Sequence, residues 1–137
     1  MKIVLAITLV STLLFATDNT SNIEAKLKAQ NIEVVKKAAE GLNETLPQKV
    51  DKYTRLVKLQ PDGEHLIYVY ELNVSGKSDR ELTKEGKARM TAPVTHGICT
   101  SSKRFLDSGI DITYRYVSAA TQHKLFDINV SKEDCPQ

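Results

Sequence analysis

The chain has little of what marks a catalytic or cofactor site in a sequence. Its 137 residues contain no tryptophan, six glycines and three histidines. Six glycines leave little room for a phosphate-binding loop, and His65, His96 and His123 are too far apart for a metal-site spacing. No Gly-x-Ser-x-Gly elbow or comparable signature indicates a hydrolase. We therefore expect no catalytic residue, no metal and no cofactor, and we predict that the protein is not an enzyme.

The sequence also has no large excess of positive or negative charge. The sequence has 19 Lys and Arg residues against 17 Asp and Glu residues, spread along its whole length. A nucleic acid or an anionic membrane would require a cluster of basic residues. The charge balance therefore predicts neither a nucleic acid nor an anionic membrane as partner. The partner expected from the functional hypothesis below is an envelope or secreted protein.

The longest apolar run lies at the N-terminus. Residues 3–15 follow Met1 and Lys2, and Ala16 precedes a polar stretch. A basic start, an apolar centre and a small residue are the parts of a secretory signal, and the run is shorter than the ~20 residues that span a bilayer. We predict a signal peptide at residues 1–16 and a single domain at 17–137, with no transmembrane segment after cleavage. The expected location is the periplasm, with the extracellular space and an uncleaved anchor as alternatives.

The two cysteines are Cys99 and Cys135. In an exported chain of this size they most simply form a disulfide, and closing that loop would stabilise the fold by roughly 3.8 kcal/mol on a chain-entropy estimate. The alternative is a reactive thiol at Cys99 close to His96, which leaves Cys135 unexplained.

Apolar periodicity predicts an α+β domain. A helix is expected from Ser21 to about Leu46, with a break near Asn31 as an alternative, and Pro47 ends it. Residues 53–60 and 65–74, joined by a turn at Pro61-Asp62-Gly63, form a predicted β-hairpin.

The second half of the chain repeats this pattern in part. A helical region at 80–100, divided by Pro93, precedes a short helix closed by a left-handed Gly109. Residues 110–116 and 125–130 form a second predicted hairpin. The predicted fold is a long N-terminal helix, then two hairpins in an antiparallel four-stranded sheet, with the helical segment between them and the helices on one face.

Six residues are candidates for binding or for structural roles. Each hairpin has a Tyr-x-Tyr pair, for which packing is expected and ligand stacking is the alternative. Asp51 and Arg55 are expected to hold the corner between the helix and the first strand, as an ion pair, with a binding role as the alternative. The candidates are Asp51, Arg55, Tyr68, Tyr70, Tyr114 and Tyr116.

A longer pattern connects these residues. Asn-x-x-Leu-Pro-x-x-Val-Asp-x-x-Thr-Arg-Leu begins at Asn43, and Tyr-x-Tyr, Cys99, Gly109, Tyr-x-Tyr and Cys135 follow. This order resembles a group of small exported bacterial proteins of uncharacterised function. The resemblance implies a Gram-negative periplasmic setting and a common α+β fold, and it brings no known catalytic residue.

The leading functional hypothesis is a periplasmic or secreted binding or accessory protein. It would act through protein contact as an inhibitor, an immunity factor or an envelope assembly helper. If the last strand is a sheet edge, β-augmentation is expected there, flanked by Lys124, Asp127 and Lys132. The alternative is a small-ligand binder or enzyme with a pocket between the long helix and the sheet. The four tyrosines would line that pocket, and Arg55, Arg115 or His96 would converge on it.

Overall fold

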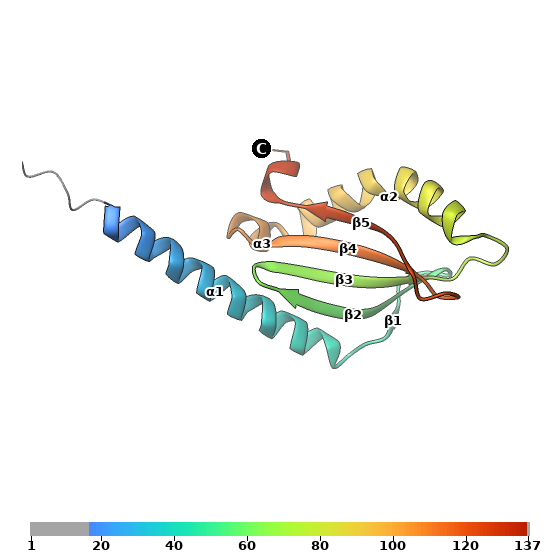
Figure 1. Ribbon diagram of the computed structural model, residues 1–137, viewed down its shortest axis with the longest axis horizontal. Helices are drawn as coiled ribbons and strands as arrows, with labels where there is room; N and C mark the ends of the chain where they lie inside the picture. Colours follow the sequence, from blue (N-terminus) through green and yellow to red (C-terminus); the bar gives the residue numbers. More distant parts are fainter. Residues whose placement is uncertain (1–16, 137) are drawn as a thin grey trace, which may run out of the picture.

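The computed structural model describes residues 17–136; the predicted signal peptide lies outside this range. In chain order the elements are α1 (Thr17–Asn43), β1 (Gln48–Lys49), β2 (Thr54–Asp62), β3 (His65–Leu72), α2 (Asp79–Ser101), α3 (Lys103–Asp107), β4 (Asp111–Ser118), β5 (Lys124–Val130) and a final 3-10 turn (Lys132–Asp134) (Figure 1). Within the described range no helix is both long and apolar enough to cross a membrane.

The α+β class, the long N-terminal helix and both hairpins are confirmed, but the sheet differs from the predicted one. It has five strands in the order β1-β2-β3-β4-β5. β3 and β4 run parallel, so the sheet is mixed. The alternation of side chains along a strand shows which residues share a face, but it does not show the direction in which the strand runs. Here α2 and α3 carry the chain back to the end of the sheet where β3 began, so β4 runs parallel to β3.

Both points at which a helix break was considered are continuous helix. α1 runs through Asn31, which is buried because its side-chain amide donates to Glu64 at 3.0 Å and to the Ser108 carbonyl at 2.8 Å. α2 runs through Pro93, which is exposed, so water can bind the carbonyl that loses its partner. The predicted left-handed Gly109 is confirmed, with φ at 88°.

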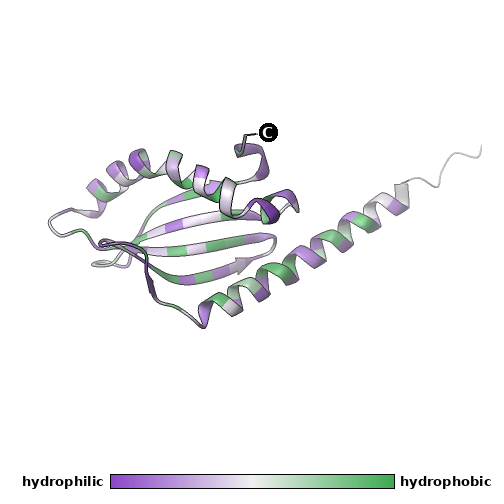
Figure 2. Cartoon of the chain, turned by 180° about the vertical axis from the view of Figure 1, so that it is seen from behind, coloured by the Kyte–Doolittle hydropathy of each residue, from purple (hydrophilic) through white to green (hydrophobic). Residues whose placement is uncertain are grey.

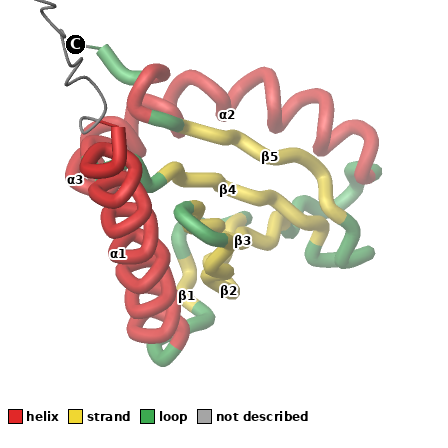
Figure 3. The backbone as a smooth tube through the Cα atoms, turned by 60° about the vertical axis from the view of Figure 1, so that its left-hand side comes forward, coloured by secondary structure: helices red, strands yellow, loops and turns green. Residues whose placement is uncertain are grey.

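The helices contribute to one apolar cluster on one face of the sheet. α1 runs along β2 and α2 along β5, with α3 at one end (Figure 3). Alternation of inward and outward side chains gives the strands their green and purple bands in Figure 2. The most deeply buried apolar residues of this cluster are Val35, Leu59, Leu66, Ile98, Ile110, Ile112 and Val130.

α1 also closes the outer edge of β2 beyond the two-residue strand β1. The Asn43 side chain donates to the Leu59 carbonyl at 2.9 Å and accepts from the Leu59 amide at 2.8 Å. One side-chain amide thus makes the two bonds that a neighbouring strand would make, which protects this edge from foreign strands.

The disulfide between Cys99 and Cys135 is present. Cys99 lies in the last turns of α2, and Cys135 follows the 3-10 turn after β5. The bond therefore joins the helical layer to the segment that leaves the edge strand.

Candidate functional site

The four tyrosines of the Tyr-x-Tyr pairs lie side by side on the helix-bearing face. The parallel register sets Tyr68 opposite Tyr114 and Tyr70 opposite Tyr116. Ring centroids are 5.1 Å apart for Tyr68 and Tyr114, 4.8 Å for Tyr70 and Tyr114, and 5.4 Å for Tyr70 and Tyr116. Phe126 continues the series at 4.8 Å from Tyr116. The rings therefore pack mainly against one another.

These phenols are held in their neutral form. Burial raises the pKa of Tyr70 and of Tyr116 well above the ordinary value, and a hydrogen bond with Tyr114 adds to the shift at Tyr70. At physiological pH their hydroxyls therefore serve as hydrogen-bonding groups.

A groove opens beside the end of this tyrosine series, between α2 and the segment that leads into β2. Its volume is about 450 Å³. We call it the α2 groove, and it is lined by Asp51, Tyr53, Thr54, Leu72, Val74, Lys77, Leu82, Glu85, Gly86, Arg89 and Met90. Of the six candidate residues, only Asp51 is part of this lining.

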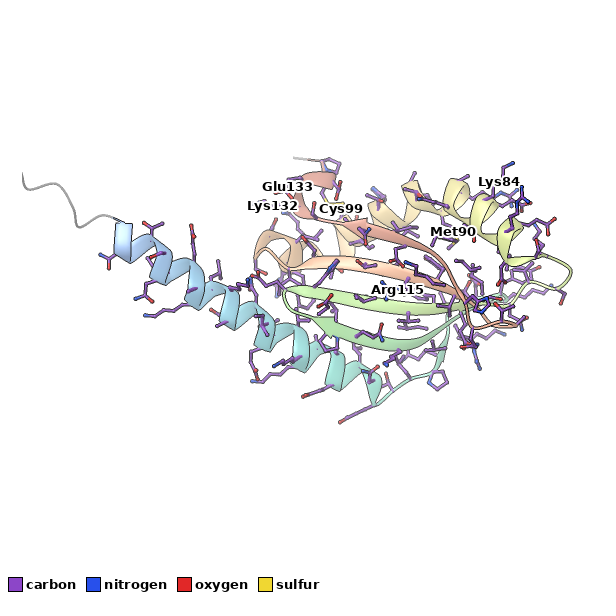
Figure 4. The ribbon with its side chains drawn as sticks, in the orientation of Figure 1. Lys84, Met90, Cys99, Arg115, Lys132 and Glu133 are labelled. Atoms are coloured by element: carbon purple, nitrogen blue, oxygen red, sulfur yellow. A yellow bond between two sulfur atoms is a disulfide. The ribbon has the colours of Figure 1, made fainter. Side chains whose placement is uncertain are left out.

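The α2 wall of the groove is fixed at both its start and its middle. A capping box between Ser78 and Glu81 begins the helix. Gly86 then lets the helix pass directly over the Phe126 ring, since a Cβ at this position would lie 2.7 Å from a ring carbon. Met90, one turn further on, lies between α2 and the sheet (Figure 4) and packs against the core.

The opposite wall is a tight turn before β2. The Asp51 carboxylate accepts from the Tyr53 amide at 2.7 Å, and the Thr54 carbonyl accepts from the amides of Val50 and Asp51. This turn leaves the apolar side chains of Val50 and Tyr53 58% and 48% exposed. Exposed apolar residues beside an apolar groove are typical of a surface that binds a partner.

Charges surround the rim of the α2 groove. Lys77 and Glu85 form an ion pair, and Arg89 and Asp51 lie on either side. The groove thus has an apolar floor and a charged rim, which is the composition of grooves that bind peptide segments.

The expected ion pair between Asp51 and Arg55 is wrong. The Arg55 guanidinium pairs with Glu71 at 3.0 Å, because the β2–β3 register sets these residues opposite each other. Gln122 also donates to Glu71, at 2.7 Å. These hydrogen bonds, first from Gln122 and then from Arg55, lower the pKa of Glu71.

The basic residues expected to converge on a tyrosine pocket lie elsewhere. Arg115 alternates with Tyr114 and Tyr116 along β4 and so points to the other face, where it holds Asp127 with two bonds of 3.0 Å. Three hollows stand out on the described surface, and none of them is lined by the four tyrosines.

His96 lines a separate hollow of about 540 Å³ around the disulfide, with Lys103 and Lys132 at its sides. Cys99 belongs to this lining as half of the disulfide, so it is not the free thiol of the alternative hypothesis. Among residues 17–136 no three His, Cys, Asp or Glu side chains gather as a metal site would require.

Sequence reasoning missed most of the α2 groove. Leu82 and Met90 belong to a weak apolar stripe in the sequence of α2. This stripe predicts that the helix packs against a core, and it does not predict a groove. Tyr53 and Gly86 gave no signal, because their roles depend on contacts between segments far apart in the chain.

This fold is shared with other proteins of solved structure. The Pseudomonas aeruginosa protein PA3611, described as secreted, matches with a TM-score of 0.70 and 12% identity, over 80% of this chain and 96% of its own. The type 2 secretion pilotin EpsS of Vibrio vulnificus matches with a TM-score of 0.65 and 15% identity, over 82% and 99%. The type II secretion pilotin AspS of Vibrio cholerae matches with a TM-score of 0.60 and 18% identity, over 82% and 98%. None of the curated proteins matches the sequence.

The α+β architecture of this chain is therefore one that is also found in two pilotins. Residues 28–126 match the model of a family described as "Domain of unknown function (DUF8479)", and the chain belongs to that family. The match begins within α1 and ends in β5, so it includes the whole α2 groove.

Proposed function

We propose that the protein is an exported accessory protein that binds an apolar segment of another cell-envelope protein in the α2 groove. The observation that carries this proposal is the groove itself, with its floor of Leu72, Val74 and Leu82 beneath charged rims and beside exposed Val50 and Tyr53. An amphipathic segment would bury its apolar side chains on the floor and pair its polar ones with the rim.

The shared fold supports the same class of function. Two of the similar structures are pilotins of secretion systems, and a third is described as secreted. The disulfide is consistent with export. That the protein has no enzymatic activity stays a prediction.

Addition of a strand at β5 is the second mode of binding. β5 is a sheet edge, which favours this mode. However, α2 runs along β5, and the Thr83 hydroxyl, which donates to the Asp79 carbonyl at 2.8 Å, also lies 3.3 Å from the Leu125 carbonyl. Part of the edge is therefore covered, and we favour the α2 groove.

Site-specific photocrosslinking in exporting cells tests the proposal. A benzoylphenylalanine replaces Tyr53 in the groove, and in a matched control it replaces Lys58, which is exposed on the other face. We expect one discrete adduct from position 53 and none from position 58. A substitution at the groove rim, Arg89→Glu, should abolish the adduct.

Other outcomes would reject the groove. Adducts of equal yield from both positions, or none from position 53, would contradict it. An adduct obtained only with the photoreactive group at Lys124 of β5 would establish strand addition instead.

A further inference from the structure

The N-terminal half of α1 extends beyond the body of the molecule. Figure 1 shows this part of the helix reaching past the end of the sheet, and every residue from Asn19 to Gln30 is exposed. We call residues 17–30 the arm. Helices shorter than roughly 12 to 15 residues are marginal in water without tertiary packing. The arm is therefore a segment whose helical form a partner would stabilise.

A largely apolar stripe runs along the arm and the next turn of α1, and it differs from the face that α1 uses for the sheet. Thr20, Ile23, Leu27, Gln30 and Val34 follow one another at alternating steps of three and four, the spacing of a coiled-coil seam. Ile23, Leu27 and Val34 are 66%, 47% and 39% exposed.

The buried face of α1 lies to one side of this stripe. Asn31, Val35 and Ala39 face the body of the protein. At 3.6 residues per turn they lie roughly a third of a turn around the helix from the stripe. A second helix can therefore lie along the stripe without displacing the sheet.

We propose that the arm pairs with the arm of a second copy of this chain, in antiparallel orientation. The four residues of the stripe from Ile23 to Val34 are symmetric about the point midway between Leu27 and Gln30. Ile23 then faces the partner's Val34, and Leu27 faces the partner's Gln30. Because the helices run in opposite directions, the two bodies lie at opposite ends of the pair.

The charges beside the stripe fit this orientation. Lys26 and Glu33 lie on the same flank of the seam, each directly before a seam residue, and in an antiparallel pair this flank of one helix faces the same flank of its partner. Lys26 therefore meets the partner's Glu33, and the contact occurs twice by symmetry.

The interface is small, so the association is weak. Three apolar side chains per copy bury less surface area than the lower limit of a standard interface, which is about 1,200 Å². Dimers should therefore form with a dissociation constant in the micromolar range or above.

Sedimentation equilibrium of the chain from Thr17 onward tests the proposal, at concentrations from about 5 to 500 μM. We expect concentration-dependent dimers, and Leu27→Asp should weaken the association at least about tenfold. Val50→Asp is the matched control, since Val50 is an equally exposed apolar residue away from the arm, and it should have no effect.

Charge reversal tests the orientation. Lys26→Glu alone places like charges beside each other and should weaken the dimer, while Lys26→Glu with Glu33→Lys should restore it. Thermal unfolding of each variant checks the body, which should be unaffected because the arm is outside the core.

Three outcomes would overturn the proposal. The first is a monomer at every concentration. The second is a dimer that Val50→Asp or the groove substitution Tyr53→Asp weakens as much as Leu27→Asp does. The third is failure of the double charge reversal to restore association. None of these results bears on photocrosslinking from the α2 groove, so the two proposals fail separately.

Discussion

The two faces of the sheet are stabilised in different ways. The helix-bearing face is sealed by ring packing and aliphatic side chains, with Leu66 and Ile112 fully buried. The opposite face is open and is held by polar ladders, such as Arg115 with Asp127 and Arg55 with Glu71. The difference teaches that this sheet derives its stability from one side, which leaves the side chains of the other free to vary.

The largest expected effect is a truncation in the sealed face. Ile112→Ala should lower the free energy of unfolding by about 4 kcal/mol, because the enclosed cavity cannot be refilled. Ile67→Ala is the matched control on the opposite face, where Ile67 is 8% exposed but lies outside the main apolar cluster, and about 2 kcal/mol is expected because neighbouring side chains can move in. Urea unfolding measures both, and equal losses would mean that the two faces do not differ.

The next largest loss of stability is expected when the disulfide between α2 and the end of the chain is removed. Replacing Cys99 and Cys135 together by serine should cost about 3 kcal/mol, because the unfolded chain gains freedom and α2 loses its anchor. Thermal unfolding with and without reductant checks this. Retention of the wild-type melting temperature in the variant would show that packing alone holds α2 in place.

A smaller and pH-dependent effect is expected on the open face. Burial alone would raise the pKa of Asp127, but the bonds from Arg115 and the charge of Lys124 outweigh it, so the pKa is lowered overall. Its stabilisation is complete above the unfolded value near pH 4 and is lost as the pH falls through the lowered folded value.

Asp127→Asn tests this contribution. At pH 7 the substitution should cost about 1 kcal/mol, and near pH 2 the variant and the wild type should converge. Unfolding midpoints across this range measure the difference. A constant gap at all pH values would show that the charge of Asp127 is not what matters.

The smallest effect is expected at Arg55. Its side chain is 57% exposed, so Arg55→Ala should change the free energy of unfolding by about 0.5 kcal/mol or less. Because Gln122 also binds Glu71, the carboxylate keeps a partner. A loss above 1 kcal/mol in urea unfolding would place this ladder alongside the sealed face in importance.

The sequence pattern within a short segment was enough to predict most of the helices and strands. The long helix, both hairpins and the left-handed Gly109 follow from apolar periodicity and from residue-specific backbone preferences. The disulfide followed from the cysteine count in a chain that is predicted to be exported. β1 left no signal, because two exposed residues have no periodicity.

Long-range pairing accounts for what the sequence could not give. The parallel β3–β4 junction depends on the path of α2, and the partner of Arg55 depends on strand register. Of the α2 groove, Asp51 alone was singled out, for a contact with Arg55 that does not form. Tyr53 and Gly86 become part of the site only when α2 crosses the ring of Phe126.

The disulfide also turns the end of the chain into a covalent ring. Residues 99–135 form one closed loop that contains α3, β4 and β5. A peptidase that cuts this loop once releases nothing, because the fragments stay joined through Cys99 and Cys135. Two cuts within the loop are needed before a strand can leave, so the ring gives the protein a tolerance of a single proteolytic cut that its melting temperature would not reveal.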